Sequence, residues 1–164
     1  MSKKVAVVMG SDSDLDTMRP CIQRLQSFGI PAEVRVISAH RTPVAAEELA
    51  SHAMENGFGV IIAAAGKAAH LAGVLAAYTT LPVIGVPIKT SMMGGLDSLL
   101  SMVQMPKGIP VACVAVDGAD NAAILAAQML ALSDEALSAK LAQFKADMAA
   151  EVAKKDEKIR MEEF

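Results

Sequence analysis

Val5-Ala-Val-Val-Met-Gly-Ser-Asp-Ser-Asp14, near the start of the chain, sets the pattern that organises the whole sequence. Its five apolar residues, bounded by a charged start and a polar loop, are typical of a buried strand. Gly10 allows a tight turn, and Ser13 or Asp14 can cap a following helix, which Gly29 ends. Apolar residues recur at helical spacing in that helix, at Leu15, Met18, Ile22 and Leu25. The stretch predicts a strand, a loop and a helix as the repeating unit.

The unit recurs four more times. Further strands are predicted at Ala32–Ile37, Val60–Ala64, Val83–Val86 and Val111–Val116. Helices are predicted from Pro43 to Asn56-Gly57 and at Ala68–Ala77, Leu96–Met105 and Ala119–Leu132. Five alternating strands and helices predict a three-layer α/β fold with a parallel five-stranded sheet. We expect the flavodoxin-like strand order 2-1-3-4-5 with right-handed crossovers, and the valines of Ala32–Ile37 indicate an outer strand with one wetter face.

An extra helix follows the last unit. Ser133-Asp134-Glu135 caps it, and its apolar positions are Leu137, Leu141, Phe144, Met148 and Val152. The length of 164 residues favours a single domain over 1–164, with 134–164 as this C-terminal helix. The helix either packs on a neighbouring subunit or stands as a solvated terminal helix, and the sequence leaves both open.

Composition limits the class of protein. Formal net charge is −3 and no basic run exceeds two residues, so we expect no nucleic-acid partner. Hydrophobic residues make up 53% of the chain and mean hydropathy is +0.39, which fits either a membrane span or a subunit interface. Residues 68–88 lack charged side chains, but Thr79-Thr80-Leu81-Pro82 interrupts them. We therefore expect no membrane span and a homo-oligomer.

Cys21 and Cys113 are the only cysteines. Each lies in an apolar element, as reduced buried thiols of a cytoplasmic protein do. The first residues lack the longer apolar region and cleavage site of a signal peptide. We therefore expect a cytoplasmic protein.

Three polar loops follow the first three strands. They are Gly10-Ser-Asp-Ser-Asp14, Ser38-Ala-His-Arg-Thr-Pro43 and Ala65-Gly-Lys-Ala-Ala-His70. In the order 2-1-3 these strands are neighbours, and loops at the carboxyl ends of parallel strands meet in one crevice. The loops would gather hydroxyls, an acid, two histidines and two cations, a set that suits an anionic, hydroxylated small molecule and proton transfer.

The first two loops carry the most specific chemistry. Ser11 and Ser13 offer hydroxyls beside helix-start amides that attract anions, whereas Asp14 would accept from sugar hydroxyls. His40 can exchange a proton near neutral pH, and Arg41 offers a planar fork for phosphate or carboxylate. A ligand-free capped helix start and a solvated His-Arg pair remain the alternative explanations.

The third loop is less specific by itself. Lys67 could neutralise an anion, and His70 could hold a polar group of a substrate or satisfy loop carbonyls. The free amides of Gly66–His70 open the next helix. The spacing of the three histidines, including His52, fits no metal site, so we expect no bound metal.

Together with Leu96-Asp-Ser-Leu-Leu-Ser-Met-Val-Gln-Met-Pro106, the three loops resemble the class I PurE family. Its members are N5-carboxyaminoimidazole ribonucleotide mutases of bacterial purine biosynthesis. The resemblance covers nearly the whole chain, and the loop that contains His40 is its most specific part.

The resemblance implies an isomerase that moves a carboxylate from the exocyclic nitrogen of its substrate to ring carbon C4, giving 4-carboxyaminoimidazole ribonucleotide. No metal, nucleotide or organic cofactor takes part. His40 matches the catalytic histidine that shuttles the proton at C4 while carbon dioxide leaves and is recaptured. The family also implies a homo-octamer with sites at subunit junctions. Its substrate-binding positions match Ser11, Asp14, Ser38, Arg41 and the loop that holds Gly66, Lys67, Ala68 and His70.

Two residues depart from the commoner family pattern: Lys67 replaces a second glycine and Ala72 replaces proline. The related class II enzymes carboxylate aminoimidazole ribonucleotide directly with carbon dioxide, and typically have lysine after the catalytic histidine and no counterpart of His70. Arg41 and His70 therefore favour class I.

A non-catalytic, nucleotide-binding flavodoxin-like domain is the alternative from another class. A phospho-receiver would need clustered acids where the third strand ends in Ala-Gly-Lys67, and a flavin carrier would need aromatic residues, which make up 3% of the chain.

Overall fold

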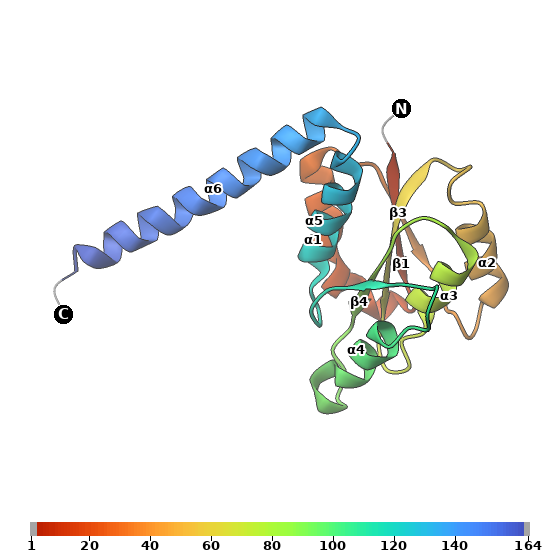
Figure 1. Cartoon of the computed structure of the whole chain (residues 1–164). Coiled ribbons are helices and arrows are strands. Elements are labelled where there is room, and N and C mark those ends of the chain that lie inside the picture. Colours follow the sequence, from red (N-terminus) through yellow and green to blue (C-terminus); the bar gives the residue numbers. More distant parts are fainter. Residues whose placement is uncertain (1–2, 163–164) are drawn as a thin grey trace.

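The computed structural model describes residues 3–162 and contains a five-stranded, all-parallel sheet in the order β2-β1-β3-β4-β5 (Figure 1). The predicted fold class and strand order are confirmed. The strands are β1 (Lys4–Met9), β2 (Ala32–Val36), β3 (Phe58–Ala65), β4 (Val83–Pro87) and β5 (Ala112–Cys113). The helices are α1 (Leu15–Phe28), α2 (Pro43–Ser51), α3 (Leu71–Tyr78), α4 (Leu96–Val103), α5 (Ala119–Ala131) and α6 (Glu135–Arg160), with short 3-10 turns at Asp12–Asp14 and Met93–Gly95.

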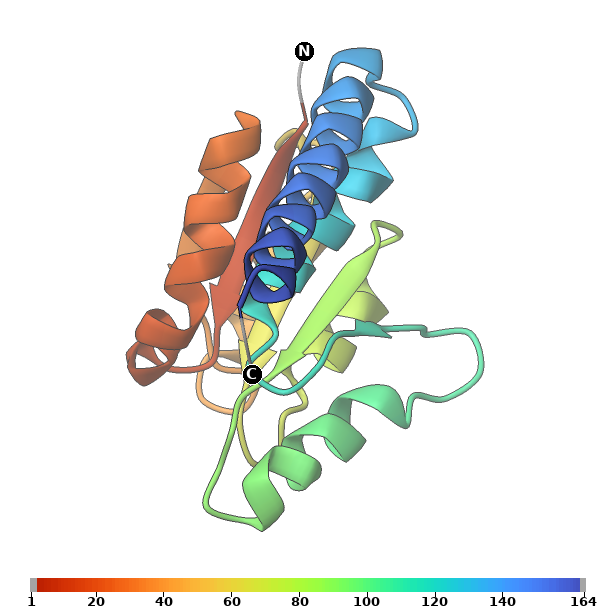
Figure 2. The same cartoon turned by 90° about the vertical axis from the view of Figure 1, so that its left-hand side faces the viewer.

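Alternate side chains of β1 enter two separate cores, because successive residues of a strand face opposite sides of a sheet. Val5 and Val7 pack with α1, α5 and the start of α6. Ala6 and Val8 pack with α2, α3 and Met102 of α4. Figure 2 views the molecule from the α6 side, where α1 and α5 cover one face of the sheet. This two-sided burial explains why β1, β3 and β4 are continuous apolar runs.

The edge strand β2 has the predicted position, but its valines do not face a core of this chain. Val34 and Val36 are 38% and 54% exposed. On the other face of β2, Glu33 forms an ion pair with Lys4 of β1, with 2.9 Å between Nζ and Oε2. The valine face is therefore apolar surface that a single chain leaves uncovered.

Several predicted boundaries are wrong. β5 was expected over Val111–Val116 but pairs with β4 only at Ala112–Cys113. It lies at the edge of the sheet, where the chain leaves the ladder after one further hydrogen bond, from the Val114 amide to the Gly85 carbonyl, 3.1 Å. Cys113 is consequently half-buried, whereas Cys21 is buried as expected.

Helix ends also differ from prediction. α2 ends at Ser51 and continues as turns up to Gly57, whose φ of +82° suits glycine. α3 begins at Leu71 rather than at Ala68, because the loop before it contains a left-handed residue. The first helix is approached through a 3-10 turn that Ser11 caps, and the Asp14 side chain makes no cap hydrogen bond.

The C-terminal helix α6 packs on the body only through its first turns. The Asp134 side chain caps it by accepting a hydrogen bond from the Leu137 amide, as predicted. Phe144 packs edge-on against Phe28, with ring centroids 5.6 Å apart, and Arg24 lies over the Phe144 ring. Residues 145–160 are all exposed and extend away from the sheet (Figure 1). The helices within residues 3–162 are all too short or too polar to span a bilayer.

Ser98 provides a test of how the loop after β4 is held. Its side chain is fully buried, and its hydroxyl donates to the Ile88 carbonyl at 2.6 Å. We expect Ser98→Ala to lower the free energy of unfolding by about 1–3 kcal/mol, because the partly buried Ile88 carbonyl loses its donor. Urea unfolding measures the change.

Ser27→Ala is the matched control, because the Ser27 hydroxyl also donates to a backbone carbonyl but is exposed. We expect it to change stability by less than about 0.5 kcal/mol. Equal effects of the two substitutions would contradict the role given to Ser98.

Candidate active site

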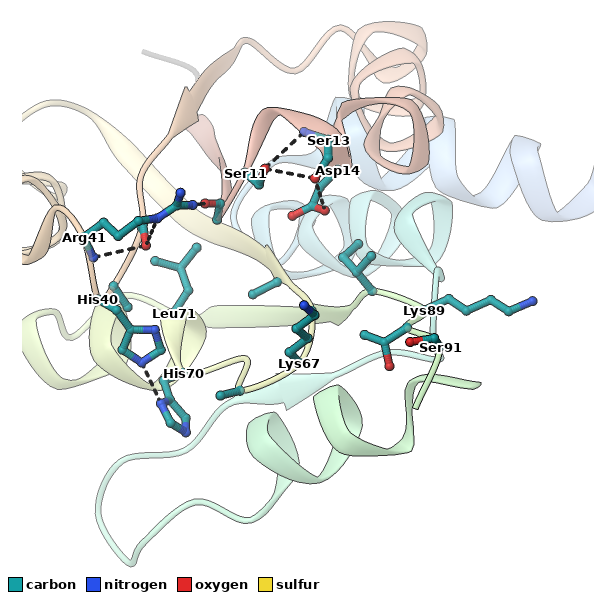
Figure 3. A pocket seen from close by; sticks show the side chains of 18 residues that line it. Ser11, Ser13, Asp14, His40, Arg41, Lys67, His70, Leu71, Lys89 and Ser91 are labelled. Atoms are coloured by element: carbon teal, nitrogen blue, oxygen red, sulfur yellow. Dashed lines mark hydrogen bonds between the residues drawn. The ribbon is translucent and has the colours of Figure 1, made fainter. Parts of the chain in front are cut away.

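A cavity of about 640 Å³ lies at the carboxyl edge of the sheet, where the loops after β1, β2, β3 and β4 meet (Figure 3). The structure brings all ten predicted site residues to this one cavity. They are Ser11, Ser13, Asp14, Ser38, His40, Arg41, Gly66, Lys67, Ala68 and His70.

The loop after β1 presents a hydroxyl cluster beside a buried acid. Ser11 Oγ accepts from the Ser13 amide at 3.3 Å and from the Ser13 hydroxyl at 2.9 Å. Asp14 is only 9% exposed, and its burial raises the pKa of its carboxyl above the ordinary 3.8, although hydrogen bonds with Ser13 and Ser11 act in the opposite direction. Asp14 is thus a desolvated acceptor at the wall of the cavity.

The loop after β2 is a closed turn that directs Arg41. Thr42 Oγ1 accepts from the Ser38 amide at 2.9 Å and donates to the Ser38 carbonyl at 3.1 Å. Arg41 donates through its amide to Ser38 Oγ at 3.2 Å and through Nη2 to the Gly10 carbonyl at 3.2 Å. The guanidinium is therefore fixed between the first and second loops, and the Ser38 hydroxyl lies beside it.

Two histidines meet at the side of the cavity. His40 Nε2 and His70 Nδ1 are 2.9 Å apart, and the rings are nearly perpendicular (Figure 3). One nitrogen must carry a proton and the other must accept it, so at least one ring is neutral while the contact persists. The arrangement holds one proton between two imidazoles that come from loops 30 residues apart.

A fourth loop completes the cavity, and sequence reasoning missed it. Ile88, Lys89, Thr90 and Ser91 line the cavity after β4. The Ser98 hydroxyl holds the Ile88 carbonyl, and the Asp117 carboxylate accepts from the Lys89 amide at 2.8 Å. Loops at the carboxyl ends of parallel strands meet in one crevice, and β4 is parallel to β3 and ends at the same edge. The same reasoning that grouped the first three loops would therefore have included this one.

Comparison with known proteins places the chain in a family. The family model described as AIR carboxylase matches residues 4–151. The chain is 52% identical over 155 residues to the N5-carboxyaminoimidazole ribonucleotide mutase of Pyrococcus horikoshii, covering 94% of this chain and 88% of that protein.

Two further matches agree with this family assignment. The chloroplastic phosphoribosylaminoimidazole carboxylase of Vigna aconitifolia is 48% identical over 158 residues, which cover 96% of this chain but 28% of that longer protein. The crystal structure of Treponema denticola PurE superimposes with a TM-score of 0.87 at 27% identity, covering 95% of this chain and 98% of the other.

The burial of the Asp14 carboxyl predicts that this residue lowers the stability of the folded protein at neutral pH. Because the pKa is raised in the folded protein, the ionised carboxylate opposes folding at neutral pH, and this opposition disappears as the pH falls below the raised pKa. We therefore expect Asp14→Asn to increase the free energy of unfolding at neutral pH, with a smaller gain in acid. Urea unfolding at the two pH values measures both.

Asp16→Asn is the control, because the Asp16 side chain is 90% exposed. We expect no comparable gain from it. An Asp14→Asn protein that is less stable than the parent at neutral pH would show that the carboxylate supports the fold.

Proposed function

The chain belongs to the AIR carboxylase family, and we propose that it performs its reaction in the cavity at the carboxyl edge of the sheet. The protein catalyses the reaction of relatives with which it shares about half of its residues. It is an N5-carboxyaminoimidazole ribonucleotide mutase, an isomerase of purine biosynthesis. The His40–His70 contact inside that cavity is the observation that carries the assignment of the active site.

We propose that the loops after β1 and β2 bind the ribose phosphate. Arg41 is held by the Gly10 carbonyl and the Ser38 hydroxyl, so its guanidinium and the Ser38 hydroxyl lie together as donors suited to phosphate. Ser11 adds a hydroxyl to the lining of the same cavity. Asp14 would repel phosphate, but its acceptor oxygens suit ribose hydroxyls. Ser13 and the amides of Gly66 and Ala68 complete the polar lining.

We propose that His40 moves the proton. The carbon–nitrogen bond of the carbamate breaks, carbon dioxide is released, and the exocyclic nitrogen receives a proton. Ring carbon C4 then forms a bond to the same carbon dioxide and loses its proton. One proton is added and one is removed, so a single imidazole can serve both steps, and His70 positions it.

Retention of carbon dioxide requires a closed site, and the single chain leaves this one open. His40, Arg41, Lys67 and His70 are all exposed. Apolar side chains are exposed as well, at Val36 and Val44 near the second loop, and at Met92, Met93, Leu96, Leu100 and Val103 around α4. We propose that neighbouring copies in a homo-octamer cover these surfaces and close the site.

The projecting half of α6 (residues 145–160) fits the same proposal. Its exposed Met148 and Val152 continue the apolar face that begins with Leu141 and Phe144 on the body of the chain. A 26-residue helix reaches about 39 Å, far enough to lie on another subunit. We therefore regard residues 1–164 as one domain whose last helix packs on a neighbouring copy. The role in purine biosynthesis fits a cytoplasmic location.

Replacement of His40 tests the mechanism. We expect His40→Asn to fold and to bind 4-carboxyaminoimidazole ribonucleotide, but to lose roughly 10²–10⁴-fold in turnover of N5-carboxyaminoimidazole ribonucleotide, because the positioned acid–base group is gone. The assay uses purified protein without ATP or added metal.

His52→Asn provides the control, because His52 lies at the end of α2 and outside the cavity. We expect it to keep normal turnover. A His40→Asn enzyme that keeps its turnover would remove His40 from the mechanism, and a parent protein inactive on this substrate would refute the function itself.

The assembly has its own test in α6. We expect the double substitution Met148→Glu with Val152→Glu to leave the helix content intact but to reduce both the mass in solution and the activity, because the site is completed by neighbours. Light scattering and circular dichroism measure mass and folding.

The control is the double substitution Ala150→Glu with Lys154→Glu. It adds at least as much negative charge as Met148→Glu with Val152→Glu does, but on the opposite face of α6. We expect this control to assemble normally. A fully active monomer from either protein would contradict a shared site.

A further inference from the structure

Lys67 occupies a backbone conformation that a glycine would adopt more easily. Its φ is +57°, in the left-handed region where a Cβ atom is crowded. The loop is fixed there: the Lys67 carbonyl accepts from the Ala69 amide at 2.8 Å and from the Ser101 hydroxyl at 3.4 Å. Strained residues that the surrounding structure holds in place are concentrated at ligand sites.

The Lys67 side chain is directed into the cavity. In Figure 3 it extends from the third loop toward the loop of Ser11 and Asp14, whereas the Lys89 side chain extends away from the other lining residues. Among the ion pairs within 4 Å in residues 3–162, none includes Lys67. Its ammonium is therefore a cation of the cavity that no neighbouring carboxylate neutralises.

The cavity consequently has two cationic positions. Arg41 lies between the first and second loops, beside the Gly10 carbonyl and Ser38. Lys67 reaches in from the third loop. The proposed substrate has two anionic groups, a phosphate and a carboxylate, separated by the ribose and the ring. A ligand with one anion at each end matches two separate cations.

We propose that Lys67 binds the migrating carboxylate of substrate and product, while Arg41 binds the phosphate. This inference rests on the proposed function. The carboxylate is charged both on the exocyclic nitrogen and on C4, but carbon dioxide between the two is neutral. Lys67 thus stabilises both ground states more than the intermediate, and acts as a specificity residue rather than as the proton carrier.

Two ligands distinguish binding of the carboxylate from binding of the phosphate. 4-Carboxyaminoimidazole ribonucleotide carries both anions, and aminoimidazole ribonucleotide carries only the phosphate. We expect Lys67→Gly, measured by titration calorimetry on the full-length protein, to weaken the first ligand roughly tenfold and the second by less than about twofold. Glycine suits the positive φ, so the substitution should not impair folding.

Three further variants complete the test. Lys67→Arg keeps the charge and should restore most of the affinity for the carboxylated ligand. Arg41→Lys should weaken both ligands, because both carry the phosphate. Lys107→Met, which removes an exposed lysine outside the cavity, should weaken neither. In turnover, Lys67→Gly should raise KM for the carboxylated substrate without lowering kcat, because the lost contact is stronger to the bound carboxylate than to neutral carbon dioxide.

Two results would overturn the inference. An equal loss of affinity for both ligands would place Lys67 at the phosphate, and unchanged affinity for both would place its ammonium outside the binding site. Either could occur in an enzyme that still isomerises the substrate. Failure of the parent protein to bind either ribonucleotide would instead refute the proposed function.

Discussion

The parallel register of four strands is the constraint on which the site depends. Met9, the last residue of β1, pairs with Val36 on one side and Ala64 on the other, and Ala65 pairs with Pro87 of β4. Four loops therefore leave the sheet at one level and on one edge. No single loop makes a site, but their common origin places hydroxyls, an acid, two histidines and the cations Arg41 and Lys67 around one cavity.

The chemistry depends on how rigidly these loops are held. Three polar contacts tie the loops to one another or to a helix: Arg41 to Gly10, His40 to His70, and Ser98 of α4 to Ile88. Burial of Asp14 and the left-handed Lys67 both oppose folding locally, and the apolar cores on the two faces of the sheet offset them. The exposed histidine pair and the exposed apolar side chains around α4 are surfaces that we propose neighbouring copies cover.

Much of the fold could be predicted because local and global signals agree. β1, β3 and β4 are apolar runs between polar loops, and Gly29 and Pro43 mark helix ends by their backbone preferences. The failures have physical causes. β5 pairs with β4 alone, at Ala112 and Cys113, and α3 starts late because Lys67 turns the backbone. No local sequence pattern shows that His40 would contact His70. The placement of α6 was also left open by the sequence, which suits either packing on a neighbouring subunit or a solvated terminal helix.

We propose that these loops form one ribonucleotide site in which His40 acts on the ring. The most direct measurement is a crystal structure of the protein with 4-carboxyaminoimidazole ribonucleotide bound. We expect the phosphate beside Arg41 and Ser38, the ribose hydroxyls at Asp14, and ring carbon C4 facing His40. A ribonucleotide bound outside this cavity, or inside it with the phosphate at His40, would show that His40 does not act on the ring.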